Sequence, residues 1–252
     1  MRSGFNRAMF LLVLALLFSC GAVSNNNVSR PGDNKSVTIL NESGIPLQAD
    51  PDGNVRWIEA KDGEFNDRAM RYLPDLSKLE WLEISNSSLS NKGMKYLKKC
   101  TGLKRLYIHD MNLKGEELAW ISGLNQLEAL SLQNTQIDGK FLKYLNAVDT
   151  LKVLNISGNN ISDEDLAQIA RFKNLEVLSV ANTQISGTGI KALERMTRLN
   201  EFNIENCNVQ DNDLSSFLTM PNLRIVYATG CKLSSYAIGN IIAQFPSLAI
   251  FL

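Results

Sequence analysis

The chain has 252 residues, which is enough to bury a substantial core in one large domain or two small ones. Its 26 lysines and arginines are matched by 26 aspartates and glutamates, so the formal net charge is zero. This balance argues against the basic surface that is typical of nucleic-acid-binding proteins.

The first predicted element is a signal peptide over residues 1–19. Arg2 and Arg7 form a positive leader, and an uninterrupted apolar run follows from Ala8 to Phe18. A helix of this length spans only about 16 Å, whereas the hydrocarbon core of a membrane is about 30 Å thick. The segment therefore reads as a cleaved export signal and not as a membrane-spanning helix.

Cys20 ends this segment in the sequence LFSC, which resembles the lipobox of bacterial lipoproteins. The resemblance implies cleavage before Cys20 and attachment of lipid, including acyl chains such as palmitate, to that residue. Phe18 departs from the family pattern, which prefers a small residue there. The alternative is cleavage after Ala22, which would release a soluble protein. By the same resemblance, Gly21 after the cysteine favours sorting to the outer membrane.

Between the signal peptide and the main domain, we predict two short segments. Residues 20–36 are small and polar and predict a flexible tether. Residues 37–54 predict an N-terminal cap, with a short hairpin over Val37–Leu47 around an Asn-Glu-Ser-Gly turn.

The rest of the chain repeats with a period of 24 residues. Similar segments begin at Leu79, Leu103, Leu127, Leu151, Leu175, Leu199 and Leu223. A weaker copy begins one step earlier at Val55, and a final partial copy begins at Leu248, one residue late. A fixed period of this kind indicates a repeat architecture.

The repeated segment resembles the leucine-rich repeat, L-x-x-L-x-L-x-x-N-x-L, over residues 55–252. The unit LKVLNISGNNI matches fully, with Leu154, Ile156, Asn159 and Ile161 in the family positions. The resemblance implies an α/β solenoid, or horseshoe, with a concave parallel β-sheet and short helices on the convex side.

The residues support the same architecture independently. Apolar residues alternate with polar ones at the start of each unit, which predicts a short strand with one buried face. Later in the unit, Leu166, Ile169 and Phe172 are spaced to form an apolar stripe on a short helix. Ser162, Ser186 and Ser234 occupy the positions expected for helix N-caps.

The remaining cysteines have predicted places inside this solenoid. Cys207 and Cys231 fall in the ninth position of their repeats, where the family has asparagine, and Cys100 falls in a buried apolar position. A disulfide between Cys207 and Cys231 is not sterically excluded, because neighbouring strands lie about 4.8 Å apart.

No grouping of residues in the sequence predicts catalysis. His109 is the only histidine, and there is no phosphate-binding glycine loop or nucleophile elbow. Asp211-Asn212-Asp213 lacks the rest of a calcium loop and predicts a capped helix start. We therefore predict a protein that is not an enzyme and has no cofactor and no metal.

Binding in a solenoid depends on the side chains that point outward from the strands, here at positions three, five and seven of each repeat. The N-terminal strands carry residue types enriched at binding hot spots. The predicted partner-binding residues are Trp57, Trp81, Glu83, Arg105, Tyr107 and His109. For Trp57 and Trp81 the alternative is that the N-terminal hairpin covers them as part of the cap.

The C-terminal sequence YAIGNIIAQFPSLAIFL is apolar where a terminal repeat normally needs a polar outer face. Either the last helix folds over its own edge, or this edge packs against another chain, for example in a homodimer.

Together these features predict a lipid-anchored protein of the bacterial cell envelope that binds a protein partner through its concave sheet. A glycan or cell-wall binding module is the alternative, since Trp and Tyr rings also suit sugar rings.

Overall fold

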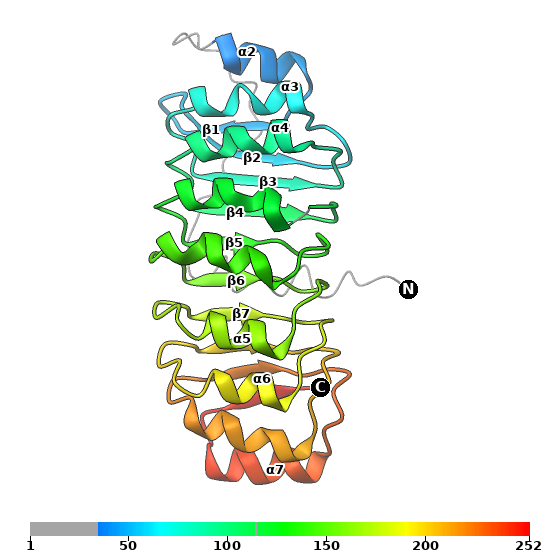
Figure 1. Ribbon diagram of the computed structural model, residues 1–252. Coiled ribbons are helices and arrows are strands. Elements are labelled where there is room, and N and C mark those ends of the chain that lie inside the picture. The colour runs from blue at the N-terminus through cyan, green and yellow to red at the C-terminus, as the bar shows by residue number, and fades with distance from the viewer. Residues whose placement is uncertain (1–34, 114) are drawn as a thin grey trace.

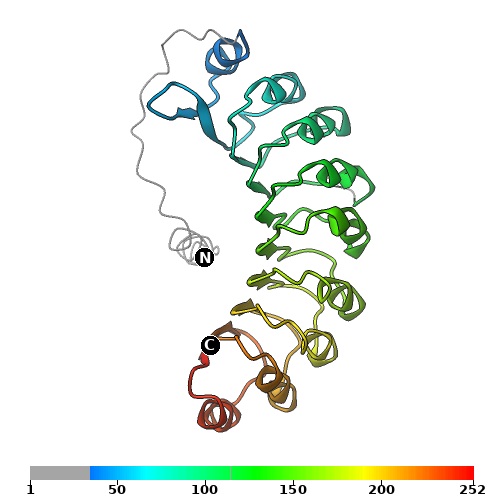
Figure 2. The ribbon, with the colours of Figure 1, turned by 90° about the vertical axis from the view of Figure 1, so that its left-hand side faces the viewer.

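The computed structural model describes residues 35–113 and 115–252. These residues form a curved solenoid in which the strands line the concave side and the helices line the convex side (Figure 1, Figure 2). The predicted signal peptide, Cys20 and nearly all of the predicted tether lie outside the described residues.

The sheet follows the order of the chain from β1 to β10, and each strand pairs with its neighbours in sequence. The strands are β1 (Leu47–Ala49), β2 (Val55–Ala60), β3 (Trp81–Ser85), β4 (Arg105–His109), β5 (Ala129–Ser131), β6 (Val153–Asn155), β7 (Val177–Ser179), β8 (Glu201–Asn203), β9 (Ile225–Tyr227) and β10 (Ala249–Phe251). β1 is antiparallel to β2, and β2 to β10 are parallel. This confirms the predicted leucine-rich-repeat fold.

The convex side carries both α-helices and 3₁₀-helices. The α-helices are α2 (Lys35–Glu42), α3 (Asp67–Met70), α4 (Asn91–Met94), α5 (Asp163–Ile169), α6 (Gly187–Ala192) and α7 (Ser235–Gln244). The 3₁₀-helices are η1 (Leu73–Asp75), η2 (Lys95–Lys99), η3 (Gly115–Gly123), η4 (Gly139–Ala147) and η5 (Asp211–Thr219). These helices pack against one another between neighbouring repeats.

The predicted hairpin over Val37–Leu47 is wrong. Residues Lys35–Glu42 form helix α2, and Gly44, with φ of 78°, ends it. The Ile45 N–H donates to the Leu40 carbonyl and the Gly44 N–H donates to the Asn41 carbonyl, which is the Schellman pattern of a helix C-terminus. The antiparallel pair at this end is instead β1 with β2.

The core is a continuous apolar cluster between the sheet and the helices. In the repeat that begins at Leu151, Leu154, Ile156 and Ile161 are fully buried, as are Leu166 and Ile169 of α5. Packing of this kind stabilises each repeat only through its neighbours.

A ladder of side chains at the ninth position of the repeat ties successive turns together. Asn159 accepts hydrogen bonds from the backbone N–H groups of Thr135 and Ile137 and donates one to the carbonyl of Leu132. The Cys207 thiol donates to the carbonyl of Val180, and the Cys231 thiol donates to the carbonyl of Ile204. In each case the acceptor lies 27 residues earlier in the chain, which is also the spacing between Asn159 and Leu132. Both thiols are free, which confirms their predicted role in the ladder.

The backbone turns through a left-handed residue at the eighth position of each repeat. These residues are Asp62, Asn86, Asp110, Asn134, Gly158, Asn182, Asn206 and Gly230, with φ between 49° and 79°. Asp, Asn and Gly are the residues that adopt this conformation most readily.

Helix starts are also linked from one repeat to the next. Ser90, Ser186 and Ser234 are N-caps, and each donates through its backbone N–H and its hydroxyl to an aspartate of the preceding repeat: Asp67, Asp163 and Asp211. Ser162 forms a capping box with Asp165. The predicted helix start at Asp211 is confirmed as the first residue of η5.

The C-terminal edge of the solenoid exposes apolar side chains. Ile242 is 37% exposed, Phe251 50% and Leu252 57%. Ile238 and Ile241 of α7 are buried toward the core, but α7 leaves Phe251 on the last strand open. Among the described residues, no helix has the length and apolar character needed to cross a membrane.

Candidate functional site

The strands place the predicted site residues in continuous files on the concave face. Trp57 lies opposite Trp81, and Trp81 opposite Arg105, in the register of β2, β3 and β4. Glu83 lies opposite Tyr107 in the next file. Parallel register, with one repeat per strand, brings together residues that are 24 positions apart in the chain.

Four aromatic rings and one guanidinium form what we call the aromatic cluster: Trp57, Trp81, Tyr107, His109 and Arg105. The rings of Trp57 and Trp81 stack with their centroids 4.3 Å apart. Arg105 lies over Trp81, 5.1 Å from the ring centroid, and Tyr107 meets Trp81 edge-on at 5.5 Å. Contacts of a cation and an aromatic edge with one indole are electrostatically favourable.

His109 lies on the side of the cluster that faces the middle of the sheet. Its ring stacks on Tyr107 with centroids 6.1 Å apart, and its Nε2 lies 2.9 Å from the Ser131 Oγ. This contact fixes the ring against β5.

The members of the predicted site differ in their exposure. Trp57, Trp81, Arg105 and His109 are partly exposed. Tyr107 is 2% exposed and Glu83 is 5% exposed, so these two side chains support the surface from below. Burial raises the pKa of the Tyr107 hydroxyl well above its usual value.

Trp57 is not covered by a hairpin. Its neighbour in the sheet is Gln48 of β1, which pairs beside it in the same plane of strands. The cap at this end therefore extends the sheet, and the indole of Trp57 remains partly exposed.

Three buried donors of the aromatic cluster have no hydrogen-bond partner in the described part of the chain. They are Nε1 of Trp57, Nε1 of Trp81 and the hydroxyl of Tyr107. A buried polar group without a partner costs about 1–3 kcal/mol. Of the five such atoms among the described residues, the other two, Asn91 Oδ1 and Trp120 Nε1, lie outside the cluster.

One file of side chains in the middle of the concave face is apolar and small. Ala129, Val153 and Val177 pack in a row beside Tyr107, and all are buried. Because these side chains are short, they project less from the sheet than the rings of the aromatic cluster do.

The C-terminal strands hold a second group of polar side chains, which was not predicted from the sequence as a site. Glu201 is 3% exposed, Glu205 9% and Tyr227 8%. Desolvation raises the pKa of Glu201 to about 7. Their positions were visible in the sequence, but their burial was not, because it depends on how closely the neighbouring strands pack.

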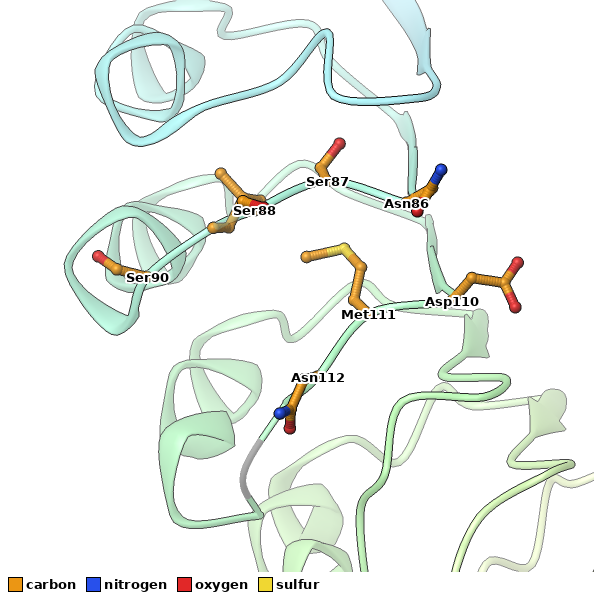
Figure 3. A pocket seen from close by; sticks show the side chains of 8 residues that line it. Asn86, Ser87, Ser88, Ser90, Asp110, Met111 and Asn112 are labelled. Atoms are coloured by element: carbon orange, nitrogen blue, oxygen red, sulfur yellow. The ribbon is translucent and has the colours of Figure 1, made fainter.

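A pocket of about 510 Å³ lies on the lateral side of the solenoid, between the loops that follow β3 and β4. Met111 points from one loop toward Ser87 and Ser88 of the other (Figure 3). Met111 occupies the ninth position of its repeat and has no side-chain donor, so it cannot bond the preceding turn as Asn159 does. Among the described residues of the lining, Asp110 is the only charged one.

The geometry offers no metal site within the described residues: no three His, Cys, Asp or Glu side chains there are grouped to hold an ion. What the arrangement presents is a curved sheet with an aromatic and cationic surface at one end and buried carboxylates at the other.

The fold is that of a leucine-rich-repeat solenoid, a class that typically provides protein-interaction surfaces. Residues 150–170 and 173–193 match the family model described as Leucine Rich repeat. No protein with a curated description matches the chain.

Solved structures of bacterial leucine-rich-repeat proteins share this fold. Internalin C2 of Listeria monocytogenes is 23% identical, with a TM-score of 0.60 over 80% of this chain and 81% of the internalin. A leucine-rich-repeat protein of Leptospira interrogans is 18% identical, with a TM-score of 0.51 over 72% of this chain and 51% of that protein. At these identities the likeness shows the fold alone.

Proposed function

We propose that this chain is a non-enzymatic binding protein, held by lipid on Cys20 outside the bacterial cytoplasm, and that it binds a protein partner through the aromatic cluster. The partly exposed Trp57, Trp81 and Arg105, stacked in one file on the concave face, are the observation that carries the proposal.

The stacking favours a protein over a glycan. One face of the Trp81 indole lies against Trp57, and Arg105 lies over the ring as well. A sugar needs a free aromatic face, whereas a protein partner can use the exposed edges of the rings and the guanidinium. Trp and Arg are also the residues most often found at the energetic centre of protein interfaces.

The proposal places the solenoid on the cell envelope, at the outer membrane. The LFSC sequence at Cys20 and Gly21 after it support this location through their resemblance to bacterial lipoproteins. An acyl chain contributes about 0.8 kcal/mol per buried methylene, so several chains give stable attachment.

The exposed apolar edge at Phe251 and Leu252 supports a further part of the proposal, pairing with a second copy of the chain.

Crosslinking on intact cells, followed by mass spectrometry, would identify the partner, and its affinity would then be measured for variants. We expect Trp81→Ala and Arg105→Ala each to weaken binding by at least about ten-fold, because hot-spot truncations cost about 2 kcal/mol or more. Tyr236→Ala is the matched control, since Tyr236 is an aromatic residue 80% exposed on α7. Unchanged affinity in both site variants, with their circular dichroism spectra intact, would contradict the proposal.

A further inference from the structure

Glu201 occupies an unusual position on the concave face. In the register of the sheet it lies between Val177 of β7 and Ile225 of β9. It is 3% exposed, yet no group in the described part of the chain donates a hydrogen bond to its carboxylate or pairs with it. A buried carboxylate without a partner is strongly unfavourable, so its presence needs an explanation.

The surroundings of Glu201 are acidic and aromatic. Tyr227 of β9 lies in the neighbouring file, where burial raises the pKa of its hydroxyl and the nearby charges of Glu201 and Glu205 raise it further. Glu205 accepts a hydrogen bond from the Asn203 amide at 3.2 Å. Phe251 stacks on Tyr227 with ring centroids 5.4 Å apart and stays half-exposed.

No basic residue of the described part of the chain faces this group. The concave positions of β5 to β10 carry no lysine, arginine or histidine, as the sequence shows. Arg105 and His109, the basic groups of the aromatic cluster, belong to β4, four strands before β8 in the sheet. At about 4.8 Å per strand, this is a separation of about 19 Å.

We propose that Glu201, Tyr227 and Glu205 form a second binding site on the concave face, which takes the cationic side chain of an arginine or lysine from a protein partner. Charge complementarity identifies the occupant. Its positive head group pairs with Glu201, and its methylene stem lies along Val177 and Ile225. The Tyr227 ring offers a face for a cation–π contact.

The raised pKa of Glu201 is consistent with this role. Burial holds the pKa at about 7 in the absence of a cation, and a bound cation would stabilise the charged form and lower the pKa again. The groups that face Glu201 are Val177 and Ser179 of β7, Ile225 and Tyr227 of β9, and Asn203 and Glu205 on its own repeat. Tyr227 and Glu205 are the titratable members of this set.

The test uses the full chain and N-acetyl-arginine amide as the probe. Carboxyl ¹³C NMR would follow Glu201 while the probe is added, with citrulline amide as the uncharged control of the same shape. We expect a saturable shift with the arginine probe, a fall in the pKa of Glu201, and no comparable effect of citrulline. In Glu201→Gln the dissociation constant, followed through the Tyr227 ring signals, should rise at least about ten-fold.

Glu194→Gln is the matched control variant, because Glu194 lies in the turn after α6 on the convex side. Equal effects of the arginine and citrulline probes, or unchanged affinity in Glu201→Gln, would overturn the proposal. So would an equal response to calcium chloride, which would make this a general cation site. The outcome does not depend on the aromatic cluster, so failure here would leave the proposed function standing.

Discussion

Glu201 shows how a single side chain can reduce the stability of an otherwise regular fold. In the unfolded chain a glutamate has a pKa of about 4.3, whereas burial raises the pKa of Glu201 in the folded protein to about 7. Between these two values the folded state binds more protons than the unfolded state. The free energy of unfolding therefore falls as pH rises through this range, and the loss is complete above about pH 7.

We expect Glu201→Gln to stabilise the protein above neutral pH and to leave its stability nearly unchanged near pH 4.5. The substitution removes the charge that must be desolvated but keeps the shape of the side chain. Urea denaturation of both proteins at pH 4.5 and pH 8 would measure the difference, with Glu194→Gln as the control. A difference of the same size at both pH values would show that the charge of Glu201 has no such effect.

The polar links between repeats belong to the starts of the helices. Gly187 opens α6, and a Cβ atom at this position would lie 1.9 Å from the Asp213 Oδ1. Asp213 cannot easily give way, because its other carboxylate oxygen accepts a hydrogen bond from the Gln210 N–H in the capping box of η5. The first turn of one helix is thus shaped to fit the cap of the next.

We expect Gly187→Ala to lower the free energy of unfolding by about 1–3 kcal/mol, because the new methyl group overlaps a fixed carboxylate. The matched control is Gly239→Ala in the middle of α7, where a Cβ would meet nothing within 4 Å. There alanine should stabilise the helix by up to about 1 kcal/mol. Urea denaturation of the two variants should therefore give changes of opposite sign, and two changes of the same sign would contradict this reading of the helix starts.

The elements that repeat could be predicted from the sequence, because each prediction was supported by several copies. The strands, the N-caps Ser162, Ser186 and Ser234, and the ladder positions of Cys207 and Cys231 all follow from one register. The segment before the first repeat had no copies to support it. The sequence Asn-Glu-Ser-Gly in this segment is compatible both with a hairpin turn and with the C-terminus of a helix. In the structure it ends helix α2, which packs onto the first repeat.

The candidate site could be predicted only in part. The prediction that equivalent outward positions of successive repeats lie side by side is confirmed. Trp57, Trp81 and Arg105 could therefore be placed together from their 24-residue spacing alone. The burial of Tyr107 and Glu201 could not, since it depends on the neighbouring side chains along each file and on the curvature of the sheet. A polar residue at an outward position gives no sign in the sequence that its neighbours will desolvate it.

Considered as a whole molecule, the solenoid starts at α2, and the predicted anchor Cys20 lies upstream of it in the chain. Attachment by the N-terminus is consistent with a concave face that stays accessible to a partner, since the sheet is not needed for anchoring.

We expect cells expressing the chain to incorporate labelled palmitate into it, and Cys20→Ala to abolish the incorporation. The label would enter through the acyl chains of a diacylglyceryl group on the Cys20 thiol and through acylation of its new amino terminus. Cys100→Ala is the control, because Cys100 is buried in the solenoid and burial raises its pKa to about 12, which leaves the thiol protonated and unreactive. Labelling that persists in Cys20→Ala would rule out this anchor.

The sequential order of the sheet, in which every strand pairs only with its neighbours in the chain, has an evolutionary consequence. A duplication or deletion of one whole 24-residue unit leaves every remaining unit with a neighbour of the same shape. The length of such a protein can therefore change in steps of one repeat without redesign of its core. A gene of this kind can lengthen or shorten the distance between two binding sites while each site stays intact.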